Sequence, residues 1–317
     1  MSKSGRQQTV HEITVSAPAE AVYRLIAEVE NWPALFPPTV HVEVIERTAA
    51  AERISIWATA NGEAKSWTSR RNLDPGAMRI EFRQEVSAPP VAEMGGTWVI
   101  EPISAGRSKV ELFHDFRALD DDPAGIEWIE SAVERNSRSE LAALKRNAEL
   151  LTGGDDRLLS FEDVVLIDGA VEDVYAFINE ADRWAQRLPH VARVELREDV
   201  PGLQLLAMDT RTKDGSTHTT ESVRVCFPDR KVVYKQTTLP ALMSLHTGYW
   251  TFVADGSRTV ATSQHTVVIN TDNIAGVLGA DADLPKAREF VRTALSTNST
   301  TTLRHAKEHA EQVRRAS

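Results

Sequence analysis

The sequence predicts an α+β protein of two tandem domains, each an antiparallel sheet curved around a long C-terminal helix. The chain has 317 residues, which is about twice the usual length of a domain. Its two halves repeat one another, and each half reads as a strand, a helix, several strands and a long closing helix. Together these observations favour a duplicated domain over one large domain.

The repeat is dense near the start of each half. The residues that recur 152 positions later are Val22, Tyr23, Ile26, Glu28, Trp32, Pro37, Val42 and Glu43. Further along, Ser69, Arg71, Trp98, His114 and Asn136 return in the second half as Ser222, Arg224, Trp250, His265 and Asn298. The run TGGDD at 152–156 has a flexible composition and separates the copies. We therefore expect domains at 1–152 and 157–317.

Composition and charge exclude several classes of protein. Lys and Arg total 36 against 46 Asp and Glu, and the net charge of −10 argues against a nucleic-acid partner. We find neither a secretory signal pattern nor an apolar run long enough to span a membrane, so we expect a cytoplasmic protein without a membrane partner. Cys226 is the single cysteine, which excludes an internal disulfide and a cysteine-based metal site. No phosphate loop or metal-ligand spacing occurs, so we expect no cofactor and no metal.

The elements of the first half follow from periodicity. Strand alternation occurs at 11–17, and a helix is expected from about residue 18 because apolar residues then recur at helical spacing. The segment WPALFPP at 32–38 breaks that helix. Further strands are expected at 52–60, 77–86, 95–103 and 108–116. A closing helix carries the stripe Ile129, Val133, Asn136, Glu140, Ala143 and Leu144.

A curved antiparallel sheet that grips a long helix must bury one face of each against the other. This helix-grip arrangement can leave a cavity between the sheet and the helix. Polar side chains that point inward are therefore candidates for chemistry.

Arg71 is the first such candidate. Trp67, Ser69 and Arg71 share one strand face by alternation, and this is the apolar face. A buried guanidinium needs a carboxylate, a backbone oxygen or a ligand oxygen, because an unpaired buried charge is costly. A structural salt bridge explains Arg71 as well, although Ser222 and Arg224 repeat the pattern.

His114 is the second candidate, because it alternates with apolar residues and an imidazole can move protons near neutral pH. A satisfied core histidine is the alternative. Its counterpart His265 lies where both faces carry apolar residues, so its direction stays open. Asn136 and Asn298 interrupt the closing-helix stripes and could equally bridge helix to strand.

Large aromatic side chains could form the walls of the cavity. Packing in the core explains most tryptophans equally well. The candidate wall residues are Trp32, Phe36, Trp67, Trp98, Trp184 and Trp250.

These segments resemble a known family. ENWPALFP, SWTSRR, GTWVIEP, FHDF and the helix ERNSRSELAALK are together similar to the two-domain polyketide aromatase/cyclases of bacterial type II polyketide synthases, within the START/Bet v1-like superfamily. The resemblance implies that Trp67, Ser69, Arg71 and His114 line the first pocket. It implies the same for Ser222, Arg224 and His265 in the second pocket. A pocket tyrosine of some relatives is replaced here by Thr39, and the second copy has Thr220 in place of the strand tryptophan.

The resemblance implies an enzyme that binds a poly-β-ketone on an acyl carrier protein, alongside other synthase subunits. It would close the first ring, between the seventh and twelfth carbons of a ketoreduced chain, and then dehydrate and aromatise it. Arg71 or Arg224 would stabilise an oxyanion, His114 or His265 would move protons, and Ser69 or Ser222 would assist.

Two other interpretations stay open. The same fold serves non-catalytic carriers of lipids and other hydrophobic ligands. Alternatively, one repeat is catalytic and the other is a scaffold, as the substitution at Thr220 hints.

Overall fold

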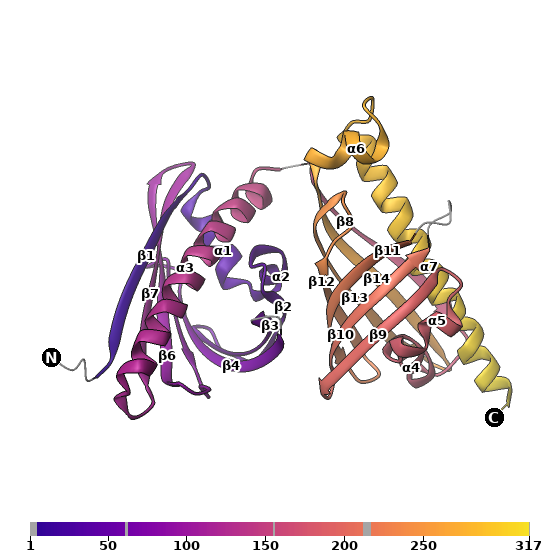
Figure 1. The fold of residues 1–317 in the computed structure, drawn as a ribbon, viewed down its shortest axis with the longest axis horizontal. Helices are drawn as coiled ribbons and strands as arrows, with labels where there is room; N and C mark the ends of the chain where they lie inside the picture. The colour runs from indigo at the N-terminus through magenta and orange to yellow at the C-terminus, as the bar shows by residue number, and fades with distance from the viewer. Residues whose placement is uncertain (1–4, 61–62, 155, 212–216, 317) are drawn as a thin grey trace. The chain divides into compact units, whose positions relative to one another are not determined.

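The computed structural model describes residues 5–60, 63–154, 156–211 and 217–316. The chain divides into two compact units, Met1–Asp155 and Asp156–Ser317. Each unit contains a seven-stranded antiparallel sheet and a long C-terminal helix (Figure 1). The predicted α+β helix-grip fold is therefore confirmed.

In the first unit, short helices separate the first strand from the rest of the sheet. Its elements are β1 (Gln7–Val15), α1 (Ala19–Ala27), α2 (Trp32–Leu35), β2 (Thr39–Arg47), β3 (Ala51–Ala60), β4 (Glu63–Asp74), β5 (Arg79–Gln84), β6 (Val91–Ser104), β7 (Arg107–Ala118) and α3 (Pro123–Thr152). The strand order is β1-β7-β6-β5-β4-β3-β2, so β1 pairs with β7 at one edge. The α1–α2 segment thus carries the chain from one edge of the sheet to the other.

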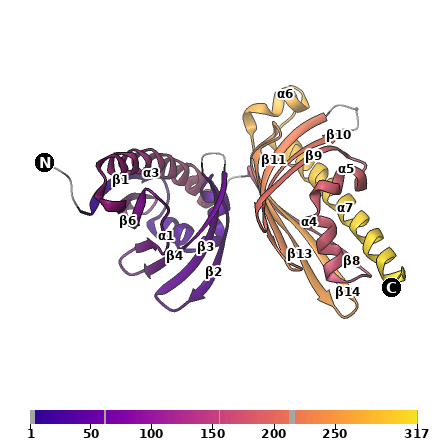
Figure 2. The ribbon, with the colours of Figure 1, turned by 60° about the horizontal axis from the view of Figure 1, so that its bottom comes forward.

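The second unit repeats this order (Figure 2). Its elements are β8 (Leu158–Ile167), α4 (Val171–Asn179), α5 (Trp184–Arg187), β9 (Val191–Val200), β10 (Leu203–Arg211), β11 (Thr217–Phe227), β12 (Lys231–Thr238), β13 (Met243–Asp255), β14 (Arg258–Ile269), α6 (Ile274–Leu278) and α7 (Leu284–Ala316). Three short helices go beyond the sequence expectation: α2 lies within WPALFPP, its counterpart α5 lies in the second unit, and α6 lies in the extra stretch of the second half.

The start of α3 is fixed by local chemistry. Asp122 accepts a hydrogen bond from the backbone N–H of Gly125 at 2.9 Å, and Pro123 occupies the first turn, where its missing N–H costs nothing. The helix then packs along β1 and β7. Its buried residues Ile129, Val133, Ala143 and Leu144 belong to the predicted stripe and close the core over the sheet.

Candidate active site

Each unit contains a cavity between its sheet and its long helix. The first cavity has a volume of about 570 Å³ and the second about 140 Å³. The first is lined by Trp32, Phe36, Trp67, Ser69, Arg71, Trp98, His114 and Asn136 among others, and the second by Trp184, Ser222, Arg224, Trp250, His265 and Asn298 among others. All the residues singled out from the sequence therefore lie in a cavity wall, including His265, whose direction the alternation left open.

The first cavity has aromatic walls on the α2 side. The rings of Trp32 and Phe36 meet edge to face with centroids 5.5 Å apart, and Phe36 stacks on Trp98 at 6.1 Å. Such walls favour flat, conjugated ligands. Thr39 also lines this cavity.

Arg71 is held rigidly. The residue is 2% exposed. Nε donates to the Glu52 carboxylate at 2.9 Å, and Nη1 donates to the Ile26 carbonyl at 2.8 Å. The guanidinium also lies 5.1 Å from the Trp32 ring centroid. Arg71 therefore forms the structural ion pair considered above, which joins β4 to β3, and its hydrogen bond to Ile26 ties β4 to the end of α1. The predicted oxyanion role of Arg71 stays a prediction.

Ser69 and His114 contribute differently to the first cavity. The Ser69 hydroxyl donates to the Arg83 carbonyl at 3.0 Å. His114 Nδ1 lies 3.3 Å from the Ser137 hydroxyl of α3, while Nε2 has no hydrogen-bond partner among the described residues. Burial lowers the pKa of His114 to about 4, and His11 adds to the effect. The imidazole is therefore neutral near pH 7 and offers a ring nitrogen for proton exchange.

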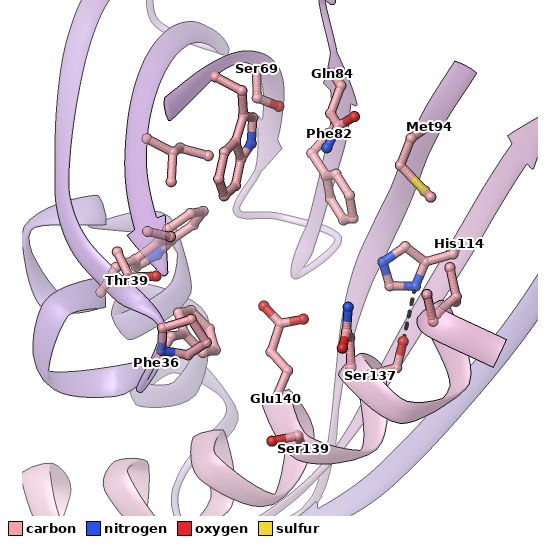
Figure 3. A pocket seen from close by; sticks show the side chains of 18 of the residues that line it. Phe36, Thr39, Ser69, Phe82, Gln84, Met94, His114, Ser137, Ser139 and Glu140 are labelled. Carbon is pink, nitrogen blue, oxygen red and sulfur yellow. Dashed lines mark hydrogen bonds between the residues drawn. The ribbon is translucent and has the colours of Figure 1, made fainter. Parts of the chain in front are cut away.

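Glu140 lines the first cavity, although the sequence analysis did not select it as a site residue. Figure 3 shows its carboxyl group rising from α3 into the cavity, across from Phe82, Met94 and His114. Within the described residues it makes no hydrogen bond or ion pair, and burial raises its pKa to about 7. A carboxyl group with this pKa can both accept and donate a proton near neutrality. The sequence offered one signal that could have identified Glu140, namely its place in the apolar stripe of the closing helix.

The second cavity has a buried arginine without a carboxylate. Arg224 is 2% exposed, and Nη2 donates to the Ile178 carbonyl at 2.6 Å. Nη1 has no hydrogen-bond partner. Gln204 stands where the first unit has Glu52, as each is paired with the arginine in the strand register. The second guanidinium therefore lacks the counter-ion of the first.

A hydrogen-bonded cluster surrounds His265. Its Nδ1 lies 2.8 Å from the Tyr234 hydroxyl and 3.0 Å from His246 Nε2, and its Nε2 lies 3.2 Å from the Ser263 hydroxyl. His246 Nδ1 lies 2.9 Å from Gln236 Oε1. Burial lowers the pKa of both imidazoles, to about 4 for His265. Burial also raises the pKa of Tyr234, so the phenol stays protonated.

The two cavities differ at matched positions. Phe82 and Tyr234 each pair with the strand arginine of their unit. Met94 lies 152 positions before His246. The second cavity therefore has a phenol and an imidazole where the first has a phenyl ring and a thioether. The comparison of the two copies was the signal that could have identified Tyr234 and His246.

Two negative findings apply to the described part of the chain. In residues 5–60, 63–154, 156–211 and 217–316, no group of three or more His, Cys, Asp or Glu side chains is placed to hold a metal ion. Within the same ranges, none of the helices has the length and apolar character needed to cross a membrane.

Comparison with known proteins identifies the family. The family described as "Polyketide cyclase / dehydrase and lipid transport" matches residues 6–149 and again 159–311. The chain belongs to this family. The double match agrees with the two units and confirms the tandem arrangement.

Relatives and solved structures are similar along nearly the whole chain. The "Granaticin polyketide synthase bifunctional cyclase/dehydratase" of Streptomyces virginiae is 51% identical, over 92% of this chain and 96% of the relative. The corresponding actinorhodin protein of Streptomyces coelicolor is 45% identical, over 96% and 98%.

Among solved structures, the di-domain ARO/CYC BexL from the BE-7585A biosynthetic pathway is 63% identical with a TM-score of 0.92, covering 96% of this chain and 99% of BexL. The di-domain ARO/CYC StfQ from the steffimycin pathway is 35% identical with a TM-score of 0.88, covering 96% and 98%. The resemblance to two-domain aromatase/cyclases and the expectation of an enzyme are confirmed.

Proposed function

We propose that this cyclase/dehydratase family member closes and dehydrates the first ring of a poly-β-ketone that is carried on an acyl carrier protein. The observation that carries the proposal is the first cavity. Its volume of about 570 Å³ accommodates a folded chain, and it combines aromatic walls with an unpartnered carboxyl group and a neutral imidazole. The high identity to granaticin and actinorhodin cyclase/dehydratases supports the reaction class and a role beside other type II synthase subunits.

The chemistry uses Glu140 as the proton carrier. In its ionised form the carboxylate removes a proton from a carbon between two carbonyls, which gives an enolate. The enolate carbon attacks a ketone of the same chain, and the resulting alkoxide takes a proton from His114 or from a held water. The imidazolate or hydroxide that this leaves removes the second proton of the attacking carbon, while protonated Glu140 donates to the hydroxyl group, so that water leaves, the double bond forms and Glu140 is ionised again. The cavity contributes by holding the reacting carbons close together and by excluding bulk water.

Arg71 and Ser69 take supporting roles in this proposal: Arg71 stabilises the oxyanion, and the Ser69 hydroxyl assists the proton transfers. The guanidinium is a fixed positive group in the cavity wall, and its charge favours the developing oxyanion even though Glu52 offsets part of it. Closure between the seventh and twelfth carbons of a ketoreduced chain is the regiochemistry that the family resemblance implies. We retain it as part of the proposal.

Reconstitution tests the proposal directly. A minimal type II synthase and a ketoreductase are combined with and without this protein, and the aromatic products are compared by mass spectrometry. We expect a mixture of shunt products to become one product with an aromatic first ring. An unchanged mixture in the presence of folded protein would instead favour a non-catalytic carrier of hydrophobic ligands.

A matched pair of variants then tests the site. Glu140→Gln removes the acid–base group while keeping its size, and we expect a loss of about 100-fold or more in the rate of ring formation. Glu127→Gln on the exposed face of the same helix is the control, and it should match the native protein. Equal rates for the two variants would remove Glu140 from the mechanism.

A further inference from the structure

The opening of the first cavity is marked by the exposed side chains among its lining residues, which we call the rim. The rim consists of Pro37, Pro38, Lys65, Trp128, Arg135, Asn136 and Ser139. Its two charged members are Lys65 of β4 and Arg135 of α3, and no exposed acidic residue of the described chain lines the cavity. The rim is therefore cationic, although the whole chain has a net charge of −10.

The protein leaves both rim cations available to a ligand. Within the described residues, neither Lys65 nor Arg135 forms an ion pair or a side-chain hydrogen bond. By contrast, Arg138 on the same helix pairs with Glu134. A cleft that combines charges of one sign with apolar walls focuses the electric field and attracts ions of the opposite sign. The rim therefore favours a ligand that has an anionic group at the opening of the cavity.

The second unit shows that the fold itself does not require this charge. Counted from the repeated strand serine and helix asparagine, it has His218 in place of Lys65 and Thr297 in place of Arg135. Among the described residues that line the second cavity, Arg224 is the only Lys, Arg, Asp or Glu. The cationic rim is thus a property of the first cavity alone.

The rim charge and the carboxyl group of Glu140 occur in the same unit. By the same count along the helix, Thr302 takes the place of Glu140 in the second unit, and it lines the second cavity. The first cavity alone therefore combines a cationic opening with an acid–base group inside. This combination suits a substrate that reacts at one end and carries an anion at the other.

The phosphopantetheine arm of a carrier protein has this chemistry. Its phosphodiester carries one negative charge, and a neutral chain with two amides joins that group to the thioester of the bound polyketide. At the rim, Trp128 is 55% exposed and offers an apolar face to the neutral chain. One cavity extends from the rim to Glu140 and His114. A polyketide that reacts beside Glu140 can therefore have its phosphodiester at the rim.

We propose that Lys65 and Arg135 hold the phosphodiester of the phosphopantetheine arm while the polyketide lies in the first cavity. This assignment rests on the carrier-bound substrate proposed above, and it makes the first unit the one that receives the arm. The phosphodiester need not contact both side chains at once, because each cation attracts it across the opening.

Binding of two small probes to the full-length protein tests the assignment without any turnover. Pantetheine 4′-(methyl phosphate) carries the single negative charge of the carrier-bound arm, whereas pantetheine is neutral. In NMR titrations at low salt, we expect the diester to bind about three- to tenfold tighter than pantetheine, since exposed charge pairs contribute modestly. The preference should largely disappear in about 0.3 M salt, because the charges are then screened. Equal affinities at low salt would overturn the proposal.

Two double variants with the same loss of charge make the binding test specific. Lys65→Gln with Arg135→Gln removes the rim cations, and we expect it to abolish the preference for the diester. Arg138→Gln with Arg146→Gln removes two positive charges from α3 outside the cavity wall, and it should keep the preference. A preference that the rim variant retains, or that the control variant also loses, would show that the phosphodiester is not held at the rim.

Kinetics with a carrier-bound polyketide then relate the rim to the reaction. The rim variant should raise KM about three- to tenfold with a much smaller effect on kcat, since the cations lie away from the reacting carbons. A KM equal to that of the native protein would contradict the proposal. If the native protein forms no aromatic product, the proposed function fails, while the probe titrations still decide whether the rim recognises a phosphodiester.

Discussion

At the scale of single residues, the ionisation of Glu140 links the site to stability. Burial raises its pKa from 4.5 to about 7, so between these values the folded protein holds a proton that the unfolded chain has released. The free energy of unfolding must therefore fall as the pH rises from 4.5 to 7. The stabilisation that comes from the raised pKa of Glu140 is complete only below pH 4.5.

Glu140→Gln should remove this pH dependence. We expect the variant to be more stable than the native protein by about 1–3 kcal/mol at pH 8, with a difference that shrinks toward zero near pH 4.5. Urea unfolding followed at pH 4.5, 6 and 8 measures it, with Glu127→Gln as the control. A gap that stays constant across this pH range would mean that the carboxyl group titrates normally.

The Arg71–Glu52 pair gives a second prediction at this scale. Glu52→Gln leaves a buried guanidinium without its counter-ion, so the first unit should lose about 3–5 kcal/mol of unfolding free energy. Arg79→Gln breaks an exposed pair with Glu81 and should cost less than about 1 kcal/mol. If denaturant titration gives similar losses for both variants, the buried pair contributes no more than a surface pair.

The sequence predicted some site residues and not others for physical reasons. Alternation alone places Arg71 and His114 on the inner face, because a strand reverses its side chains at every residue. The sequence analysis did not select Glu140, because a carboxylate in an apolar stripe of a helix is normally assumed to reach solvent. Tyr234 and His246 escaped because their role depends on cross-strand neighbours that sequence spacing does not specify.

At the scale of elements, the sheet depends on glycine where its inner face carries large rings. A Cβ built on Gly96 of β6 would lie 2.2 Å from the Phe113 carbonyl and 2.6 Å from Phe82 Cζ. Gly248 of β13 meets the Gln264 carbonyl and the Tyr234 hydroxyl in the same way, at 2.1 and 2.7 Å. The missing side chain thus lets a cavity ring cross the neighbouring strand in both units.

Gly96→Ala should consequently destabilise the first unit by about 1–3 kcal/mol and push the Phe82 ring toward the cavity. Gly106→Ala is a suitable control, because a Cβ there meets nothing within 4 Å. Thermal unfolding of the two variants measures the difference. A Gly96→Ala protein as stable as the control would show that the strand relaxes without cost.

Long elements were easier to predict than short ones. An apolar stripe that runs for many turns predicts the closing helix. Alternation of apolar and polar residues predicts the strands of the first unit. The short helices α2, α5 and α6 carry too few residues for any periodicity. The turns α2 and α5 are tied to the preceding helix, because Trp32 Nε1 donates to the Ile26 carbonyl at 2.9 Å and Trp184 Nε1 donates to the Phe177 carbonyl at 3.2 Å.

At the scale of the whole molecule, the duplication has produced two separate cores with different interiors. The apolar clusters around Leu35, Ile54 and Phe116 contain residues of the first unit alone. Those around Leu188 and Ile269 contain residues of the second unit alone. Each unit therefore closes its own core, which allowed one cavity to diverge from the other without disturbing its fold.

Separate cores predict separate unfolding transitions in the full-length chain. Ile54→Ala creates a space in the first core and should lower the unfolding free energy of that unit by about 2–5 kcal/mol, while Leu303→Ala should do the same for the second. Hydrogen exchange resolved by peptide, measured along a urea titration, assigns each loss to a unit. We expect the urea concentration at the midpoint of unfolding to stay unchanged in the unit that does not carry the substitution. Midpoints that move together for either variant would show that the units fold cooperatively, and the divergence of the second cavity would then have been constrained by the stability of the first.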